Sequence, residues 1–131
     1  MRLPSPATKW CHITWSTAGR RKFLNIAALA RFCERSLCEA LAEAGWSGEA
    51  AVLPNRVQVL VQVPAAMERS EVIARVRTVA TAVVRKAGAT PGTRRVWEEA
   101  CWCSTLSYGI AVEAVRRHLR AIGHQLSVTA R

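Results

Sequence analysis

The clearest pattern of hydrophobic and polar positions in the sequence lies in residues 56–63 (RVQVLVQV). The odd positions of this segment are all valine, while the even positions hold an arginine, a leucine and two glutamines. Successive side chains of a β-strand point to opposite faces of a sheet, so this alternation predicts a strand with one apolar and one mixed face. We expect the valine face to pack against helices and the mixed face to be accessible.

Apolar residues at helical spacing predict three helices. The first covers residues 26–44, with Asn25 as its N-cap and Gly45 as the residue that ends it. The second begins at Ser70, which can cap it, and the last covers residues 110–122. The expected buried stripe of the second helix is Val72, Val76, Val79 and Val83, and that of the last helix is Val112, Val115, Leu119 and Ile122.

Three further segments rich in aromatic and β-branched residues predict the remaining strands, at residues 10–15, 46–53 and 101–106. The predicted order is strand, helix, strand, strand, helix, strand, helix. This is a split βαβ, ferredoxin-like arrangement of the α+β class, in which an antiparallel sheet carries two helices on one face and a C-terminal helix is added. We expect a single domain over residues 1–131 with a flexible tail at 123–131.

The charge of the chain narrows the classes of function. The sequence contains 19 Lys and Arg against nine acidic residues, a net charge of +10. Such an excess favours a polyanionic partner, because binding releases the counterions condensed on it. All nine acids are glutamate, which excludes aspartate-based two-metal nuclease sites and the Ser-His-Asp triad as normally built. We therefore expect nucleic acid, rather than a membrane surface, as the partner.

The cysteines and the lack of long apolar runs bear on the compartment. Five cysteines stand at irregular spacings, which predicts free thiols in a reducing cytosol rather than disulfides or a zinc site. No apolar run approaches the roughly 20 residues that a membrane-spanning helix needs. Residues 1–11 contain no apolar stretch of signal-peptide length. The expected location is the cytoplasm.

Four stretches, taken in order, are similar to segments of a known family. They are WCHITWSTAGRRKFL at residues 10–24, LPNRVQVLVQVP at 53–64, SEVIARVRTVATAVVRK at 70–86 and VWEEACWCSTLS at 96–107. In these the sequence resembles the small single-tyrosine (HUH-type) transposases of bacterial insertion sequences, including those associated with repetitive extragenic palindromes (REP). The resemblance covers about residues 10–122. It implies a homodimer that binds single-stranded or hairpin DNA and acts in DNA transposition and recombination.

The resemblance also locates the catalytic positions. In this family two histidines, at i and i+2 of one strand, bind a divalent cation that polarises the scissile phosphate, and a tyrosine of the last helix becomes linked to the 5′ phosphate. The histidine positions correspond to Arg56 and Gln58, the tyrosine to His118 and a further polar ligand to Ile122. Arginine has only hydrogen-bond donors and a fixed positive charge, so it cannot ligate a cation. No catalytic residue and no metal site is therefore expected to be intact, and Mg²⁺ or Mn²⁺ is expected only if activity is retained.

Other residues are weaker candidates for the same chemistry. Tyr108, the single tyrosine, is a low-priority nucleophile because it lies about 15 Å before His118 along a helix. His118 is itself a candidate, because an imidazole can attack a phosphate. The spacing of His118, His124 and Gln125 disfavours a metal cluster. We assign His12, in the first strand, a structural or DNA-proximal role.

A positive charge at the former cation position suggests binding without cleavage. The guanidinium of Arg56 can hold a phosphate bidentately. The tryptophans can stack unpaired bases, although most are expected in the core or in a dimer interface. Contacts of basic side chains with phosphates position DNA without reading its sequence. The predicted DNA-binding residues are Arg20, Arg21, Lys22, Arg56, Arg75, Arg77, Arg85, Lys86, Arg94, Arg95, Arg116, Arg117 and Arg120.

The sequence thus predicts a transposase-like protein that binds single-stranded or hairpin DNA and does not cleave it. Whether the chain is an enzyme stays open at this point, since a divergent transposase could still form a phosphotyrosine or phosphohistidine intermediate. A second alternative is an RNA-binding module on the same sheet topology. The sequence lacks the aromatic-rich RNP1 signature of such modules, which disfavours that alternative.

Overall fold

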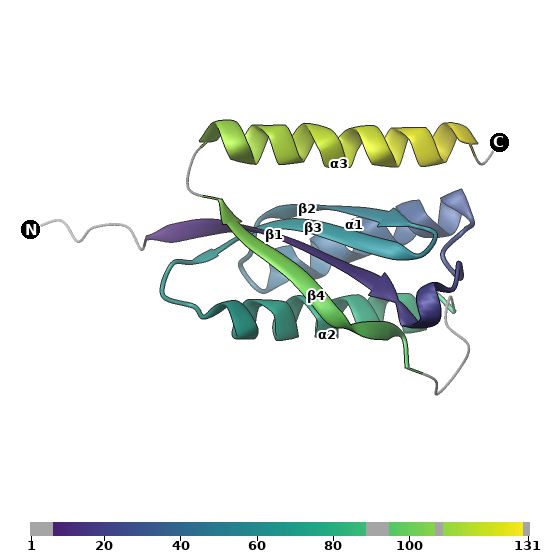
Figure 1. Ribbon diagram of the computed structural model, residues 1–131, viewed down its shortest axis with the longest axis horizontal. Helices are drawn as coiled ribbons and strands as arrows, with labels where there is room; N and C mark the ends of the chain where they lie inside the picture. Colours follow the sequence, from purple (N-terminus) through teal and green to yellow (C-terminus); the bar gives the residue numbers. More distant parts are fainter. Residues whose placement is uncertain (1–6, 89–94, 107–108, 130–131) are drawn as a thin grey trace, which may run out of the picture.

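The described part of the chain alternates strands and helices in the predicted order (Figure 1). The computed structural model describes residues 7–88, 95–106 and 109–129, and residues 123–129 by their backbone alone. Its elements are β1 (Thr8–Thr17), the short 3₁₀ helix η1 (Ala18–Arg20), α1 (Ala27–Glu43), β2 (Gly48–Leu53), β3 (Arg56–Pro64), α2 (Arg69–Lys86), β4 (Trp97–Leu106) and α3 (Gly109–Thr129).

The four strands form one antiparallel sheet in the order β2-β3-β1-β4. The central strand β1 pairs with β3 on one side and with β4 on the other, while β2 pairs with β3 through the tight turn that joins them. This topology confirms the predicted α+β, ferredoxin-like fold with an added C-terminal helix. The predicted stop of the first helix is also confirmed, since Gly45 follows α1 with a φ of +89°, a conformation that favours glycine.

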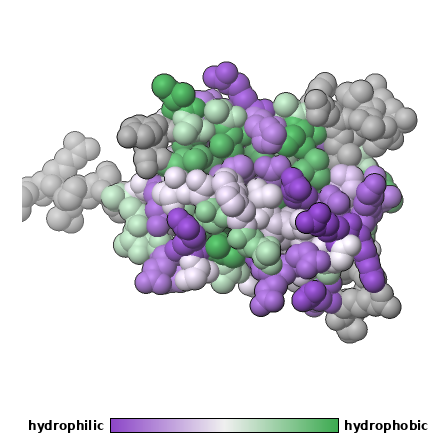
Figure 2. Space-filling view, viewed as in Figure 1, coloured by the Kyte–Doolittle hydropathy of each residue, from purple (hydrophilic) through white to green (hydrophobic). Residues whose placement is uncertain are grey.

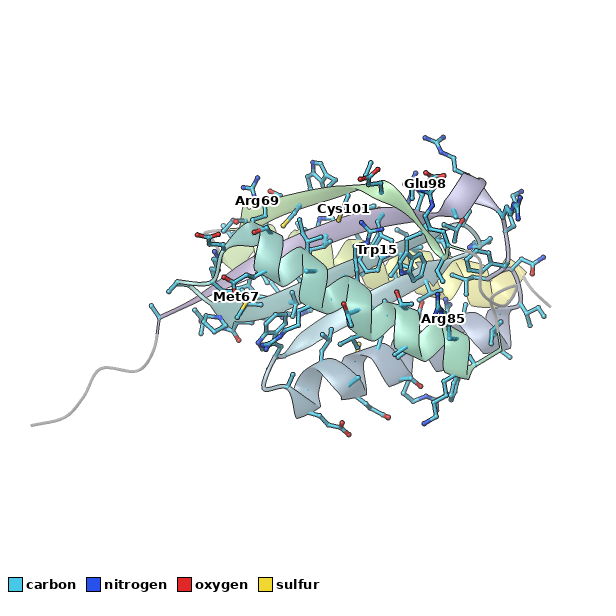
Figure 3. The ribbon with its side chains drawn as sticks, turned by 90° about the horizontal axis from the view of Figure 1, so that it is seen from below. Trp15, Met67, Arg69, Arg85, Glu98 and Cys101 are labelled. Atoms are coloured by element: carbon cyan, nitrogen blue, oxygen red, sulfur yellow. The ribbon has the colours of Figure 1, made fainter. Side chains whose placement is uncertain are left out.

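One face of the sheet is covered by α1 and α2. The four valines of β3 predicted to face helices are at most 1% exposed, which confirms that prediction. The odd positions of β1 point the same way, and Figure 3 shows Trp15 between β1 and α2. The apolar core on this face is continuous from β1 to both helices. Burying this area from water is the main contribution to the stability of the fold.

The other face of the sheet carries α3, which lies on the opposite side from α2 in Figure 1. Val112 and Leu119 of α3 pack on Ala51 of β2 and Leu60 of β3 in a second, smaller cluster. The expectation that the mixed face of β3 is accessible is therefore wrong over its middle. Leu60 is fully buried and Gln58 is 6% exposed, because α3 closes over this part of the sheet.

Three details at the helix ends differ from the sequence prediction. Ile26, not Asn25, is the N-cap of α1, and Glu68, not Ser70, is the N-cap of α2; neither cap makes a side-chain hydrogen bond. Helix α3 continues to Thr129, so residues 123–129 of the predicted tail are helical, while their flexibility stays a prediction. Residues 130–131 lie outside the described part.

The buried stripe of α2 is rotated from the one predicted. Its second half consists of Ala80 and Val84, whereas Val79 and Val83 are half-buried. The helix turns by about 100° per residue, so a shift of one position keeps the smaller alanine against the sheet and leaves the two valines at the rim. In α3, by contrast, Val112 and Leu119 are buried and Val115 and Ile122 half-buried, as the spacing predicts.

Two further properties of the described residues concern cysteines and membranes. The five cysteines are all free; Cys11 and Cys33 are buried, and the others are half-buried. Burial raises the pKa of the Cys103 thiol to about 11, which leaves little reactive thiolate. Over the described residues, no helix combines the length and the apolar character needed to cross a membrane.

Candidate nucleic-acid interface

The half of the second sheet face that α3 leaves uncovered forms a hollow. Thr14 of β1 pairs with Gln58 of β3 and with Trp102 of β4, and Ser16 pairs with Arg56. These residues share a face because alternate positions of a strand point the same way. The hollow has a volume of about 570 Å³, and we call it the sheet cleft. It is lined by Thr14, Trp15, Ser16, Arg56, Ala100, Cys101 and Trp102.

Arg56 supplies a positive charge to the sheet cleft. Its side chain is exposed at the start of β3, and over the described residues it forms no ion pair or hydrogen bond. The strand register places the hydroxyl group of Ser16 beside it. A planar guanidinium with free donors and a neighbouring hydroxyl are groups that bind phosphate.

A histidine next to the sheet cleft is held in a fixed position. His12 Nε2 donates a hydrogen bond to Gln58 Oε1 at 3.0 Å. The imidazole also packs edge-on against the indole of Trp102, with 5.1 Å between ring centroids and 84° between planes. Burial lowers the pKa of His12, the hydrogen bond to Gln58 raises it, and the charge of His118 lowers it further. The net effect lowers the pKa of His12, which favours the neutral imidazole at pH 7.

The residues at the family's metal positions do not fit a divalent cation. Arg56 offers only donors, and the carbonyl oxygen of Gln58 is already used by His12. Among the described residues, no group of three or more His, Cys, Asp or Glu is placed to hold a metal ion. The chemistry available at these two positions is therefore hydrogen bonding and charge, not Lewis-acid activation of a phosphate.

The position of the family's tyrosine, His118, lies on the flank of α3 that faces the open half of the sheet. Arg116 and Arg120, on the other flank, contact the carboxylate of Glu49 in β2 at 3.4 and 2.6 Å. A helix turns by about 100° per residue, so His118, two residues from each of them, points away from β2. His118 is exposed, on the flank of α3 opposite to Arg116 and Arg120.

The three positions at which the resemblance implies catalytic residues, Arg56, Gln58 and His118, are not joined into a single cluster by the contacts of the described residues. Arg56 and Gln58 share a strand face, Gln58 binds His12, and the charge of His118 acts on His12. Tyr108 lies outside the described residues. Ile122 packs against the apolar cluster under α3 and contributes no polar group.

Four of the predicted DNA-binding arginines are held by contacts within the protein. Arg116 and Arg120 bind Glu49, and Arg116 also pairs with Glu113. Arg77 donates to backbone carbonyls of β4. Arg75 lies over the Trp46 ring, 5.3 Å from its centroid. Each of these four side chains therefore already has a partner within the protein, and three of them join a helix to the sheet.

The other described basic residues of the predicted set are exposed, and most gather at one end of the molecule. Figure 2 shows hydrophilic side chains concentrated at the end where β1 runs into η1. Gly19 N donates to the Glu98 carboxylate at 2.5 Å, which fixes the basic turn beside the start of β4. Arg94 lies outside the described residues. The exposed set is Arg20, Arg21, Lys22, Arg56, Arg85, Lys86, Arg95 and Arg117.

Of the five tryptophans, all within the described residues, Trp102 is the one suited to stack a base. It is 55% exposed, at the mouth of the sheet cleft. Trp15, Trp46 and Trp97 are at most 5% exposed. Trp10 packs under α3 with Arg116 over its ring. The expectation that most tryptophans lie in the core is confirmed for Trp15, Trp46 and Trp97.

Thr14 and Ser16 are cleft residues that the sequence prediction missed. The signal was present, because residues 11–16 (CHITWS) alternate apolar and polar side chains as strictly as β3 does. That alternation places His12, Thr14 and Ser16 on the same face as Arg56 once β1 and β3 pair.

Solved structures share this fold. A crystal structure of a protein from Deinococcus radiodurans R1, provisionally described as a transposase, matches with a TM-score of 0.66 over 93% of this chain and 96% of that chain, at 12% sequence identity. The structure of a REP-associated tyrosine transposase bound to a REP hairpin matches with a TM-score of 0.57 over 91% of this chain and 67% of that chain, at 14% identity. No protein-family model and no curated protein matches the sequence. The fold is therefore the one found in tyrosine transposases, as the sequence resemblance implied.

Proposed function

We propose that this protein is a transposase-like DNA-binding protein that holds single-stranded or hairpin DNA at the sheet cleft and does not cleave it. The shared fold and the hairpin bound to one structural neighbour support this proposal, as does the net charge of +10. The observation that carries it is the exposed guanidinium of Arg56, which has no partner among the described residues and lines the same cleft as Trp102.

Different residues of the cleft would bind the phosphate and the base of the DNA. Arg56 donates two parallel hydrogen bonds to a phosphate, and the hydroxyl groups of Thr14 and Ser16 supply further donors. The exposed indole of Trp102 stacks on an unpaired base. His12 and Gln58 do not contact the DNA in this scheme; their hydrogen bond holds the edge of Trp102 in place.

The same residues argue against cleavage. A cation that would polarise the phosphate has no ligands at Arg56 and Gln58. Without a charge-neutralising metal, attack on a phosphodiester by His118 lacks the electrostatic stabilisation that such reactions require. The cleft therefore binds the backbone in its ground state.

Binding of a fluorescent single-stranded oligonucleotide, followed by anisotropy, tests the proposal. Arg56→Ala should weaken binding by at least about tenfold, since a charge-assisted hydrogen bond contributes about 1.5–3 kcal/mol. It should also make the dependence of log K on log salt shallower by about 0.7 for one phosphate contact. Arg35→Ala is the matched control, because Arg35 is an exposed arginine of α1 on the other side of the sheet. Equal affinities for the two variants would refute the role of Arg56.

A second candidate function is a divergent transposase, for which the exposed His118 of α3 is a candidate nucleophile. Incubation with labelled hairpin DNA and Mg²⁺ or Mn²⁺, followed by denaturing electrophoresis, separates the two functions. A binder leaves the DNA intact, whereas an enzyme yields a covalent adduct that disappears in His118→Ala or Tyr108→Phe. Competition by RNA of the same sequence distinguishes an RNA-binding module. The predicted homodimer and cytoplasmic location stay predictions.

A further inference from the structure

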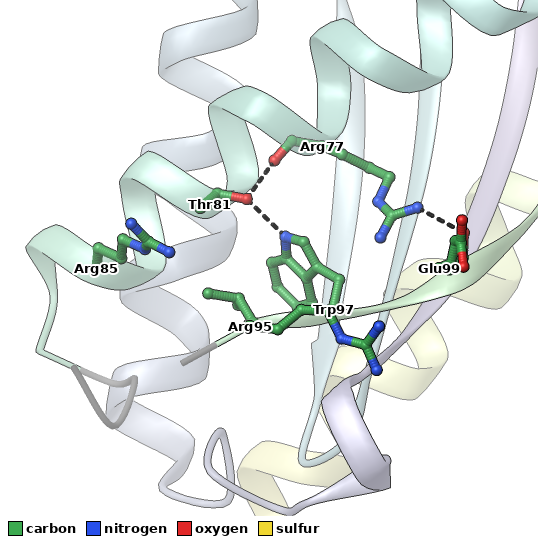
Figure 4. A pocket seen from close by; sticks show the side chains of 7 residues that line it. Arg77, Thr81, Arg85, Arg95, Trp97 and Glu99 are labelled. Carbon is green, nitrogen blue, oxygen red and sulfur yellow. Dashed lines mark hydrogen bonds between the residues drawn. The ribbon is translucent and has the colours of Figure 1, made fainter. Parts of the chain in front are cut away.

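A second hollow, rich in arginine, lies between α2 and β4 on the far side of β4 from the sheet cleft (Figure 4). Its volume is about 510 Å³. Arg77 and Arg85 come from α2, and Arg95 precedes β4. We call this hollow the arginine pocket. Thr81, Val96, Trp97 and Glu99 complete its lining.

The floor of the arginine pocket has no free polar group. Trp97 Nε1 donates to Thr81 Oγ1 at 2.7 Å, and Thr81 Oγ1 donates to the backbone oxygen of Arg77 at 2.8 Å (Figure 4). Trp97 is 5% exposed, so its ring is not available for stacking. Any ligand of this pocket is therefore recognised by the guanidinium groups.

Arg77 is fixed at the wall of the pocket by β4. Its two terminal nitrogens donate to the backbone oxygens of Glu98 and Glu99. These carbonyl groups lie on an edge strand of the sheet, since β4 ends the strand order. Arg77 therefore both covers part of this edge and holds a positive charge in one place.

Arg85 and Arg95 bring two further positive charges to the same pocket. Both are exposed, and Arg85 has no partner among the described residues. Arg95 stands 3.9 Å from the Glu98 carboxylate with 68% of its side chain exposed, a contact that contributes little. Three arginines thus line a hollow whose one acidic lining residue is Glu99. Charges of one sign gathered in this way favour a bound anion.

We propose that the arginine pocket binds the phosphodiester backbone of the same nucleic acid strand that occupies the sheet cleft. This inference rests on the proposed function. Both sites share β4: Ala100 and Trp102 line the cleft, and Trp97 and Glu99 line the pocket. The part of β4 that lines the cleft and the part that lines the pocket have centres a few residues apart. At roughly 3.4 Å per residue of a strand, this separation is about 10 Å. A single strand that leaves the cleft can pass over β4 and place a later phosphate between Arg85 and Arg95.

A length series of single-stranded oligonucleotides tests this path. The double variant Arg85→Ala/Arg95→Ala should bind an oligonucleotide of about 12 nucleotides at least about tenfold more weakly than the wild-type protein, with a salt slope shallower by about 1.4 for two phosphates. With an oligonucleotide of about 4 nucleotides, near the lower limit of one binding site, the double variant should bind as the wild type does. The control Arg35→Ala/Arg69→Ala removes equal charge from exposed positions outside the pocket.

The possible results separate this inference from the proposed function. If the double variant and the control bind the longer oligonucleotide equally well while Arg56→Ala weakens it, the arginine pocket is not a DNA site but the cleft is. If Arg56→Ala also has no effect, the proposed function fails as well. If the double variant loses affinity equally at both lengths, the second contact along the strand is refuted. Thermal melting of each variant shows whether Arg85 stabilises the C-terminal end of α2. A lower melting temperature with unchanged DNA binding would overturn the inference.

Discussion

The two faces of the sheet are built from the same strands but serve different ends. The face under α1 and α2 is apolar at every central position, and its valines and Ile13 are fully buried. The face under α3 mixes Leu60 with Gln58, His12 and Arg56, and only part of it is covered. The first face supplies the burial that holds the fold together, whereas the second keeps polar groups in fixed positions at the edge of a cleft. Stability and binding can therefore be changed separately.

The largest expected effect is on the α1/α2 face. Ile13→Ala should lower the free energy of unfolding by about 2–5 kcal/mol, because it leaves a cavity in a fully packed core. Thr14→Ala, the next residue on the opposite face, should change it by less than about 1 kcal/mol. Urea unfolding of the two variants provides the measurement. Similar losses for both would show that the faces do not differ in this way.

Replacing the exposed indole at the cleft should affect binding rather than folding. Trp102→Ala should weaken single-stranded DNA binding by about 1–3 kcal/mol, the contribution of one stacked base. Its melting temperature should change little, because more than half of the side chain is already exposed. Anisotropy and thermal melting are the two measurements. A variant that melts much earlier yet binds DNA normally would assign Trp102 to the fold instead.

Glu49 forms ion pairs with two arginines of α3 and so neutralises part of the positive charge on that helix. Glu49→Gln should lower the free energy of unfolding by about 1–2 kcal/mol, since it removes the ion pairs with Arg116 and Arg120. The same change frees both arginines and should strengthen DNA binding with a steeper salt dependence. Unchanged affinity after the loss of Glu49 would indicate that this flank of α3 lies outside the DNA path.

The smallest expected effect concerns pH. Burial lowers the pKa of His12 below its usual 6.5, so the unfolded chain takes up a proton before the folded protein does. Stability contributed by His12 is therefore complete above about pH 6.5 and is lost as the pH falls from there to the lowered pKa. When the pH is lowered from about 7.5 to 5.5, the melting temperature of His12→Gln should fall by about 1–3 °C less than that of the wild-type protein. The control variant His118→Gln is changed at an exposed site, so its melting temperature should fall nearly as much as that of the wild-type protein.

The sequence predicted the sheet and its apolar face well because strand alternation is a local signal. The valines of β3 and the aromatic residues of β1 could each be assigned without knowing their neighbours. The position of α3 could not, because its apolar stripe does not say which face of the sheet it covers. Leu60, the one apolar residue on the mixed face of β3, was the available clue.

The candidate site was less predictable because it depends on contacts between distant residues. Arg116 and Arg120 are predicted from the sequence as DNA-binding residues, but in the structure both form ion pairs with Glu49 where α3 contacts β2. The hydrogen bond between His12 and Gln58 likewise joins two strands. Arg56 is exposed, as expected for this end of the mixed face of β3, while its correspondence to a metal position and its nucleic-acid role stay predictions.

A two-dimensional ¹H–¹⁵N spectrum of the tryptophan indole groups, titrated with single-stranded DNA, shows whether the sheet cleft is the binding site. We expect the Nε1–H signal of Trp102 to move most as the protein becomes saturated with DNA, while the signal of the buried Trp46 on the other face stays in place. Saturable binding with an unmoved Trp102 signal, or with the largest change at Trp46, would contradict a nucleic-acid site at the sheet cleft.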